Sequence, residues 1–112
     1  MGRVNFHFFT DVSANSGTTT NESISLNKWH HLVGELSVSD NKIRVYVDGV
    51  MQAATTPDAT TIYYAGGDAP HFGKVFGCGG QDNFYTGKMD DVRIYNRALS
   101  AGEVKQLYNT GR

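Results

Sequence analysis

The feature that most constrains this fold is a period-two alternation of apolar residues on both sides of the dipeptide Asp48-Gly49. Successive side chains of a strand point to opposite faces, so the alternation predicts strands with one apolar face. Asp-Gly supplies the positive φ angles of a type I′ turn, which returns the chain over residues 50–54. The sequence therefore predicts an antiparallel three-stranded meander. The inward positions of its first two strands are Leu32, Leu36 and Val38, and Ile43, Val45 and Val47.

A second alternating stretch, residues 91–95, leads directly into a short amphipathic segment. Ser100 and Glu103 have the spacing of a capping box, in which each side chain satisfies a backbone N–H at the helix start. We therefore expect a strand followed by a helix over about residues 101–111 that lays one apolar stripe on the body. The apolar face of the closing strand would consist of Val92 and Ile94.

Weaker patterns predict the rest of the chain. Apolar alternation indicates strands, and clusters of Ser, Thr, Asn, Gly and Pro indicate loops. Together the elements predict an all-β antiparallel sandwich with one short C-terminal helix, in a single domain over residues 1–112. The remaining segments are a strand over 4–8, an exposed connection over 11–21, a short strand carrying Ile24 and Leu26, a polar loop over 55–70, a strand near 71–76 and a glycine loop over 77–83.

Three runs of residues, 29–34, 43–49 and 87–100, together resemble the signature of laminin-G-like, concanavalin A-like jelly-roll domains. The first two, Trp-His-His-Leu-Val-Gly and Ile-Arg-Val-Tyr-Val-Asp-Gly, are similar to the family's central strands and the turn after them. The resemblance implies a jelly-roll sandwich, used in this family for carbohydrate binding, adhesion and domain packing. Domains of this kind carry several strands before the one that resembles residues 4–9, so we expect a truncated jelly roll.

Composition and charge argue against several classes of function. A formal net charge of -1 with scattered Lys and Arg gives no basic surface for nucleic acid. Cys78 is the only cysteine, which excludes an internal disulfide and a multi-thiolate metal site. No apolar run approaches the roughly 20 residues of a membrane span, and no signal-peptide core follows Met1. The resembled family is mostly secreted or on the cell surface, but the sequence itself indicates no compartment.

The sequence offers no catalytic constellation. Its three glutamates, Glu22, Glu35 and Glu103, lie on separate predicted elements, whereas the glycoside hydrolases that resemble this fold carry closely spaced carboxylates. His30 and His31 are adjacent on a predicted strand, so they point to opposite faces and do not chelate one ion together. No Ser-His-Asp arrangement is visible around them. We therefore expect that the protein is not an enzyme.

Aromatic and polar residues in or beside two loops are the best candidates for ligand binding, because aromatic faces beside hydrogen-bonding groups suit a polar ligand. The alternative is that these rings only cover exposed backbone. Trp29 also has two interpretations, a platform that stacks on a sugar ring or an anchor in the core, and the core position is favoured. The candidate ligand-binding residues are Tyr63, Tyr64, Asp68, His71, Asp82, Asn83 and Tyr85.

Asp90 is the candidate metal ligand. The resemblance implies a calcium site with an aspartate at the start of the last strand, which is the position of Asp90. Calcium needs about six to eight oxygen ligands, and no contiguous loop here supplies them, so structural hydrogen bonding is favoured over calcium for this residue. Asp91 is expected to form an ion pair with Arg93 on the same face. Calcium is the only cofactor that the sequence points to.

These features favour a non-catalytic recognition module with carbohydrate as the expected ligand. The alternative is a structural or assembly module that acts only through protein contacts. A jelly roll without its early strands would expose an unpaired edge and part of an apolar face, which invites pairing. Either the strands rearrange into a smaller closed sandwich, or another copy of the chain covers this surface. A homodimer or a higher closed oligomer is the favoured alternative. The exposed face would consist of Val4, Phe6, Phe8, Val92 and Ile94.

Overall fold

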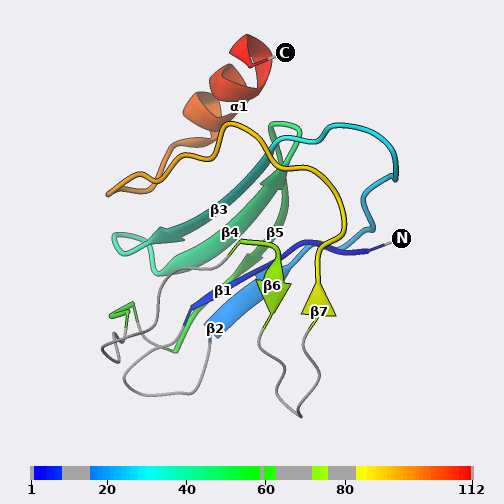
Figure 1. Cartoon of the computed structure of the whole chain (residues 1–112). Coiled ribbons are helices and arrows are strands. Elements are labelled where there is room, and N and C mark those ends of the chain that lie inside the picture. Colours follow the sequence, from blue (N-terminus) through cyan, green and yellow to red (C-terminus); the bar gives the residue numbers. More distant parts are fainter. Residues whose placement is uncertain (1, 9–15, 59, 63–71, 76–82, 112) are drawn as a thin grey trace. The chain divides into compact units, whose positions relative to one another are not determined.

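The computed structural model of the protein describes residues 2–8, 16–58, 60–62, 72–75 and 83–111. All strand pairs in it are antiparallel, in the sheets β1-β2, β3-β4-β5 and β6-β7. The mostly-β class with one C-terminal helix is confirmed, but the described residues form small sheets and not the complete sandwich that the sequence predicts. In chain order the elements are β1 (Asn5–Phe8), β2 (Ser16–Thr19), β3 (Leu32–Ser37), β4 (Lys42–Val47), β5 (Val50–Thr55), β6 (Lys74–Val75), β7 (Asn83–Phe84) and α1 (Ala101–Thr110) (Figure 1).

Two compact units make up the chain: residues 1–63 with 96–112, and residues 64–95. The larger unit contains β1 to β5 and α1, and the smaller unit contains β6 and β7. β6 lies within the strand predicted near residues 71–76, whereas residues 77–82 of the predicted glycine loop lie outside the described residues. This division does not test the prediction of a single domain. Among the described residues, no helix has the length and apolar character needed to cross a membrane.

The predicted meander is confirmed and forms the centre of the larger unit. β3 pairs with β4, and β4 pairs with β5. Asp48 and Gly49 connect β4 to β5 with φ angles of 52° and 79°, the positive values that a type I′ turn requires. The register shifts between Val45 and Tyr46, so the β4-β5 ladder contains an irregularity of the kind that a bulge produces.

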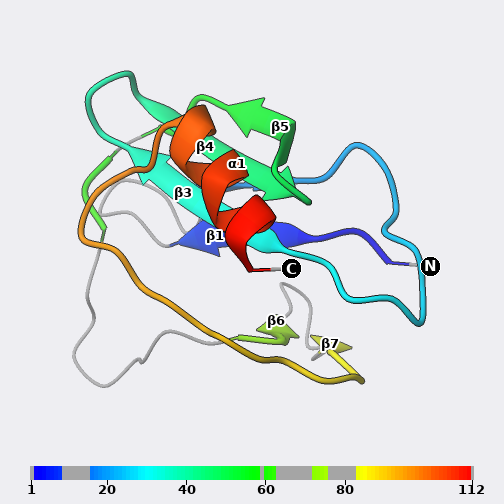
Figure 2. The same ribbon diagram turned by 90° about the horizontal axis from the view of Figure 1, so that it is seen from above.

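Each face of the meander packs against a different element. On one face, the ring of Phe6 in β1 lies so close to Gly34 that a side chain at position 34 would overlap it. On the other face, Tyr46 packs with Leu99 and with Val104 of α1. Figures 1 and 2 show the same order, with the β1-β2 hairpin on one side of the meander and α1 on the other. The most deeply buried side chains are Ile43, Val45, Val104 and Thr20.

The predicted inward face of the first meander strand is wrong for two of its three residues. Leu32 and Val38 are 46% and 66% exposed, whereas Glu35 is only 6% exposed. Glu35 tolerates burial because Arg44 Nη1 donates a 2.9 Å hydrogen bond to Glu35 Oε1, and Arg44 also pairs with Asp40. An ion pair with good geometry offsets part of the desolvation cost of a buried carboxylate. The spacing of apolar residues contains no information about such an ion pair, so it predicts the wrong buried residues for this strand.

Part of the predicted connection over residues 11–21 is a strand, because β2 pairs with β1. Thr18 and Thr20 are buried there. Thr20 Oγ1 accepts a 3.1 Å hydrogen bond from the Val4 N–H and donates at 2.7 Å to the Glu22 carbonyl oxygen. A β-branched threonine suits a strand once its hydroxyl is satisfied, although its polarity in the sequence is typical of a loop.

Two further predicted strands are not formed in the described part of the chain. The segment that carries Ile24 and Leu26 has no strand, and Leu26 is exposed. Residues 87–95 have none either, because Asp91 adopts a φ of 52°, outside the β region, and Ile94 is 76% exposed. A strand needs a partner for its backbone groups, and no described strand pairs with either segment. Alternation of side chains does not supply that partner.

α1 begins with the predicted capping box. Ser100 Oγ accepts from the Glu103 backbone N–H at 3.1 Å, and Glu103 Oε2 accepts from the Ser100 N–H at 2.8 Å. Arg97 donates to both carboxylate oxygens of Glu103, each at 2.9 Å. The hydrogen bonds from Arg97, followed by that from the Ser100 N–H, lower the pKa of Glu103 to about 2. Val104 and Leu107 form the apolar stripe that packs on the meander, as predicted.

Gly49→Ala should destabilise the protein by roughly 1–2 kcal/mol, because an L-residue is strained at this positive φ. The new Cβ would also lie 3.1 Å from Tyr108 Cδ1. Thermal unfolding would report the change as a lower Tm. Gly102→Ala is the matched control, since its Cβ would meet Ser100 Oγ at an ordinary 3.9 Å, and it should be neutral or slightly stabilising. A Gly49→Ala protein as stable as the wild type would show that the turn is not under this constraint.

The Glu103 carboxylate should make stability depend on pH in the acid range. Its pKa falls from 4.5 to about 2 in the folded protein, so its contribution is present above about pH 4.5 and is lost as the pH falls through about 2. The difference in Tm between the wild type and Glu103→Gln should therefore shrink across this window. Glu22→Gln serves as a control, because no described residue hydrogen-bonds to the Glu22 carboxylate. A Glu103→Gln difference that stays constant throughout would contradict the expectation.

Candidate functional site

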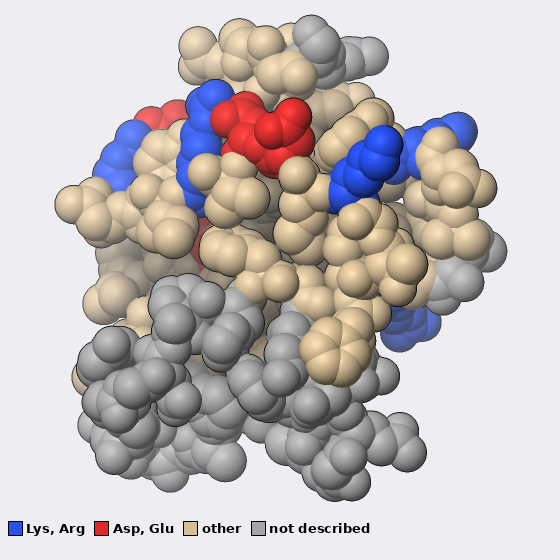
Figure 3. All heavy atoms as spheres, in the orientation of Figure 1, with Lys and Arg blue, Asp and Glu red and all other residues tan. Residues whose placement is uncertain are grey.

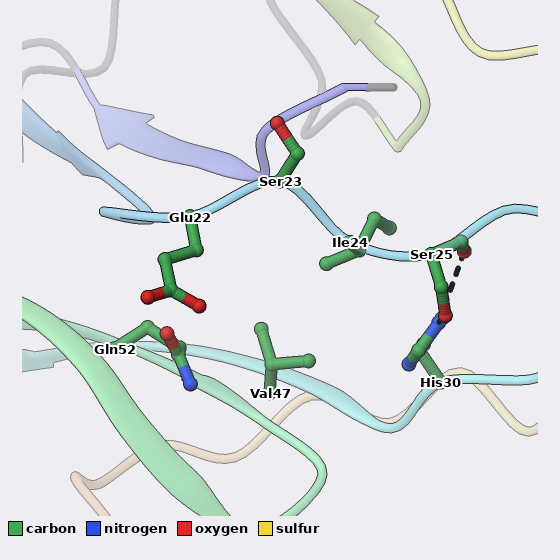
Figure 4. Close-up of a pocket in the computed structure, with 7 residues that line it drawn as sticks. All are labelled: Glu22, Ser23, Ile24, Ser25, His30, Val47 and Gln52. Atoms are coloured by element: carbon green, nitrogen blue, oxygen red, sulfur yellow. Dashed lines mark hydrogen bonds between the residues drawn. The ribbon is translucent and has the colours of Figure 1, made fainter.

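The larger unit has an open hollow of about 270 Å³, where residues 22–25 pass beside β4 and β5. Figure 4 shows Glu22 and Gln52 on one side of this hollow and His30 with Ser25 on the other, with Ile24 and Val47 between them. Charged, amide, hydroxyl and imidazole groups therefore surround a small apolar surface. The complete lining consists of Glu22, Ser23, Ile24, Ser25, His30, Val47 and Gln52.

His30 is held by hydrogen bonds at both ring nitrogens. Its Nδ1 lies 2.7 Å from Asp48 Oδ2, and its Nε2 lies 2.9 Å from Ser25 Oγ and 3.1 Å from the Ser25 carbonyl oxygen. A carboxylate only accepts, so Nδ1 carries a proton and donates it to Asp48. A neutral ring then accepts from the Ser25 hydroxyl, whereas a protonated ring donates to the Ser25 carbonyl. In both states the ring ties the loop to the β4-β5 turn.

Asp48 organises the backbone as well as the ring. Its Oδ1 accepts a 2.9 Å hydrogen bond from the His31 backbone N–H. Burial acts to raise the pKa of Asp48, but the hydrogen bonds from His30 and from the His31 N–H outweigh it and leave the pKa below its ordinary value. Asp48 is therefore ionised at neutral pH. The His31 ring lies 6.1 Å from that of Tyr108 in α1, whereas the His30 ring bonds to Asp48, so the two rings have different neighbours. The strand predicted to contain both histidines does not include them, because β3 begins at Leu32.

Sequence analysis did not bring Ser25, His30 and Asp48 together. The register of the meander could have indicated that His30 and Asp48 are neighbours. Leu32 pairs with Val47, so Asp48, which follows Val47, lies beside the segment that contains His30 and precedes β3. The hydrogen-bond order, from hydroxyl to imidazole to carboxylate, is that of a hydrolase triad. Here, however, Nε2 also lies beside the carbonyl of the same serine, so the ring acts as a brace between two segments.

The remaining polar groups of the hollow are available to a ligand. No described residue donates a hydrogen bond to the Glu22 carboxylate, although the Glu22 carbonyl accepts from Thr20. The backbone carbonyl of Gln52 accepts a 2.7 Å hydrogen bond from Asn21 Nδ2, which fixes β5 beside the loop. Carboxylate, carboxamide and hydroxyl groups next to an apolar surface can bind a small ligand that has both hydroxyl groups and C–H faces.

The candidate ligand residues from the sequence are mostly beyond what the structure describes. Asn83 is the first residue of β7, and its backbone pairs with Val75. Tyr85 is exposed, and its hydroxyl donates a 3.2 Å hydrogen bond to the Lys88 carbonyl oxygen. A ring that is bonded to nearby backbone also fits the alternative of a cover over exposed backbone, so the ligand role of these residues stays a prediction. The residues outside the described ranges are Tyr63, Tyr64, Asp68, His71 and Asp82.

Asp90 is exposed, and its Oδ1 accepts a 2.7 Å hydrogen bond from the Asp91 backbone N–H. Within the described residues, no group of three or more His, Cys, Asp or Glu side chains could hold a metal ion. The hydrogen bond is of the structural kind that the sequence favours for Asp90, and the calcium site stays a prediction. The ion pair predicted between Asp91 and Arg93 is confirmed, with a distance of 3.0 Å between Arg93 Nη2 and Asp91 Oδ2.

Trp29 does not occupy the core position that the sequence favours. It is 69% exposed, because the segment before β3 is not a strand and does not turn the indole into the body. It is the only tryptophan in the chain and directly precedes His30 of the hollow. The exposed indole is thus compatible with the other interpretation, a stacking platform.

Charged side chains are interspersed on the surface that Figure 3 shows, where Lys and Arg are separated by acidic and uncharged residues. The hollow differs from that mixed surface. The described residues that line it include one acidic residue, Glu22, and no Lys or Arg. The electrostatic character of the hollow is therefore set mainly by a carboxylate.

Comparisons with known proteins agree with this architecture. A family model described as the Concanavalin A-like lectin/glucanases superfamily matches residues 1–105. A solved S-layer domain-containing protein from Clostridium thermocellum is similar, with a TM-score of 0.59 and 20% sequence identity over 96% of this chain and 63% of that chain. At this identity the likeness shows the fold alone, and no curated protein matches. With the family model covering nearly its whole length, the chain belongs to the concanavalin A-like lectin/glucanase superfamily, in its laminin-G-like branch.

Proposed function

We propose that the chain is a non-catalytic recognition module that binds carbohydrate in the hollow beside His30. The observation that carries this proposal is the lining. Glu22, Gln52 and Ser25 offer hydrogen-bonding groups around the apolar side chains of Ile24 and Val47. A sugar ring presents hydroxyl groups at its edge and C–H groups on its faces, so it matches such a surface. The superfamily contains lectins, which supports the same class of ligand.

The placement of carboxylates supports recognition over hydrolysis. Glycosidases generally use two carboxyl groups about 5–10 Å apart across the scissile bond. Of the three glutamates, Glu35 is buried and paired with Arg44, and Glu103 caps α1. Glu22 remains as the one carboxylate among the described residues of the lining. A saccharide in this hollow would therefore be held without a second acid that could cleave it.

The hydrogen bonds of His30 favour a preformed site. The ring joins Ser25 in the loop to Asp48 in the β4-β5 turn, so the side of the hollow that carries Ser25 and His30 is held to the meander. A preformed site loses less conformational entropy when the ligand binds, which raises affinity. The aromatic loop residues from the sequence, Tyr63, Tyr64 and Tyr85 among them, remain proposed ligand-binding residues.

A structural or assembly module is the second candidate, and the exposed apolar residues favour it. Val92 and Ile94 in the smaller unit, and Leu26 and Trp29 in the larger one, are all more than half exposed. Exposed apolar groups of this size are frequent at protein interfaces. This candidate includes the homodimer expected from the sequence. Light scattering coupled to size-exclusion chromatography distinguishes the two, because a monomer that binds sugar needs no assembly role.

A glycan array followed by calorimetry, each with and without calcium, tests carbohydrate binding directly. We expect binding hits, and we expect Gln52→Ala to weaken them by about 0.5–1.5 kcal/mol through the loss of hydrogen bonds in the hollow. The matched control is Gln106→Ala on the exposed side of α1, which should bind as the wild type does. Trp29 fluorescence gives an independent readout next to His30. No hit in either calcium condition, or equal binding by the Gln52→Ala protein, would contradict this proposal.

A further inference from the structure

We propose that the hollow selects saccharides that carry a protonated amino group, and that Glu22 is the residue that distinguishes them from neutral and acidic sugars. The inference rests on the carbohydrate-binding function proposed above and adds the chemical class of the ligand. It follows from three observations: the charge of the lining, the absence of an internal partner for Glu22 among the described residues, and the position of the Glu22 backbone.

The lining of the hollow has an unbalanced charge. Among the described lining residues, Glu22 is the acidic one and none is Lys or Arg. His30 is the other titratable residue there, and its Nδ1 is paired with Asp48, so a charge on the ring is already balanced by that carboxylate. An anionic sugar such as a uronic acid would find no cation in the hollow to compensate it. A cationic sugar would find a carboxylate.

Glu22 differs from most other described acidic residues in its lack of a protein partner. Four carboxylates, those of Glu35, Asp40, Asp91 and Glu103, each pair with an arginine. No described residue forms an ion pair or a side-chain hydrogen bond with the carboxylate of Glu22. A ligand ammonium would therefore not have to displace a resident cation before it binds.

The backbone around Glu22 is anchored by hydrogen bonds, although no described residue bonds to the Glu22 side chain. The Glu22 carbonyl oxygen accepts a 2.7 Å hydrogen bond from the buried Thr20 hydroxyl, and the preceding Asn21 side chain bonds to the Gln52 carbonyl oxygen at 2.7 Å. These contacts hold the backbone at Glu22, and Figure 4 shows the Glu22 side chain at the hollow on the same side as Gln52. An ammonium has three donors and no acceptor, so the Glu22 oxygens and the Gln52 amide oxygen are suitable acceptors for it.

The rest of the lining argues for a sugar amine and not for a simple cation. Ile24 and Val47 supply an apolar surface, and Ser25 supplies a hydroxyl group on the far side of the hollow. A small ammonium ion would use Glu22 alone and leave these groups in contact with water. A hexosamine unit would place its ammonium at Glu22 while its ring covers the apolar side chains and its hydroxyl groups reach Ser25.

Calorimetry with three trisaccharides tests the inference: a glucosamine trimer, the same trimer with N-acetyl groups, and a galacturonic acid trimer, all at a pH that protonates the free amine. The wild type should bind the glucosamine trimer roughly two- to fivefold more tightly than the acetylated trimer, which is the strength expected of an exposed ion pair. The uronic acid trimer should bind most weakly. Added salt should reduce the preference, because screening weakens interactions between exposed charges.

Two variants separate the role of Glu22 from general effects of charge. Glu22→Gln keeps the shape of the side chain and should abolish the preference for the amine, so that the glucosamine trimer and the acetylated trimer bind with similar affinity. Asp58→Asn removes the same charge from an exposed residue outside the lining and should preserve the preference. A preference that survives in Glu22→Gln would overturn the inference, as would binding of lysine methyl ester as tight as that of the glucosamine trimer.

The outcomes also separate this inference from the function on which it rests. Equal binding of all three trisaccharides would overturn the selectivity while leaving carbohydrate recognition in place. No binding of any of them, together with a silent glycan array, would overturn both. Tighter binding of the uronic acid trimer would show that a cation outside the described lining dominates, and would overturn the assignment of Glu22.

Discussion

The arrangement of the larger unit depends on the hydrogen bonds of the Asp48 carboxylate. It sits in the β4-β5 turn at a φ of 52°, a conformation that Asp tolerates better than most residues. One oxygen binds the backbone N–H of His31 and the other binds the ring of His30, so a single side chain joins the turn to the segment that enters β3. Next to it, Gly49 allows Tyr108 of α1 to approach the turn closely. The helix, the meander and the loop beside the hollow therefore meet at one dipeptide.

The two faces of the meander carry different contacts. Tyr46 and Val33 face α1 and form the apolar cluster with Leu99 and Val104. The ion pair between the buried Glu35 and Arg44 joins β3 to β4 in the same meander. The hollow lies on the opposite side, where Val47 contributes its apolar surface and the loop after β2 contributes the polar groups. His31 and His30 continue this division, one toward the helix and one toward the hollow. Changes to the hollow should consequently leave the helix packing intact.

The sequence predicts the parts of this fold that depend on neighbouring residues. The Asp48-Gly49 turn and the Ser100–Glu103 capping box are local, and both are formed as expected. The sequence does not predict the features that depend on residues far apart in the chain. β2 is a strand because β1 pairs with it, and Glu35 is buried because Arg44 forms an ion pair with it. The alternation around Ile94 predicts a strand for which the described residues supply no partner. The sequence does not predict the hollow for the same reason. The hollow forms where a loop, a turn and β5 come together, and the polar residues of a loop do not indicate such a contact.

The direct test of this account is the tautomer of His30 in the wild type and in Asp48→Gly, read from long-range proton–nitrogen correlations of the imidazole ring. Glycine accommodates the positive φ of the turn, so this variant removes the carboxylate and keeps the hairpin. If Asp48 holds the ring, the wild type should carry the proton of neutral His30 on Nδ1, and Asp48→Gly should lose that preference together with the exchange protection of the His31 N–H. An unchanged tautomer and unchanged protection in a folded Asp48→Gly protein would show that the loop beside the hollow is held by other contacts.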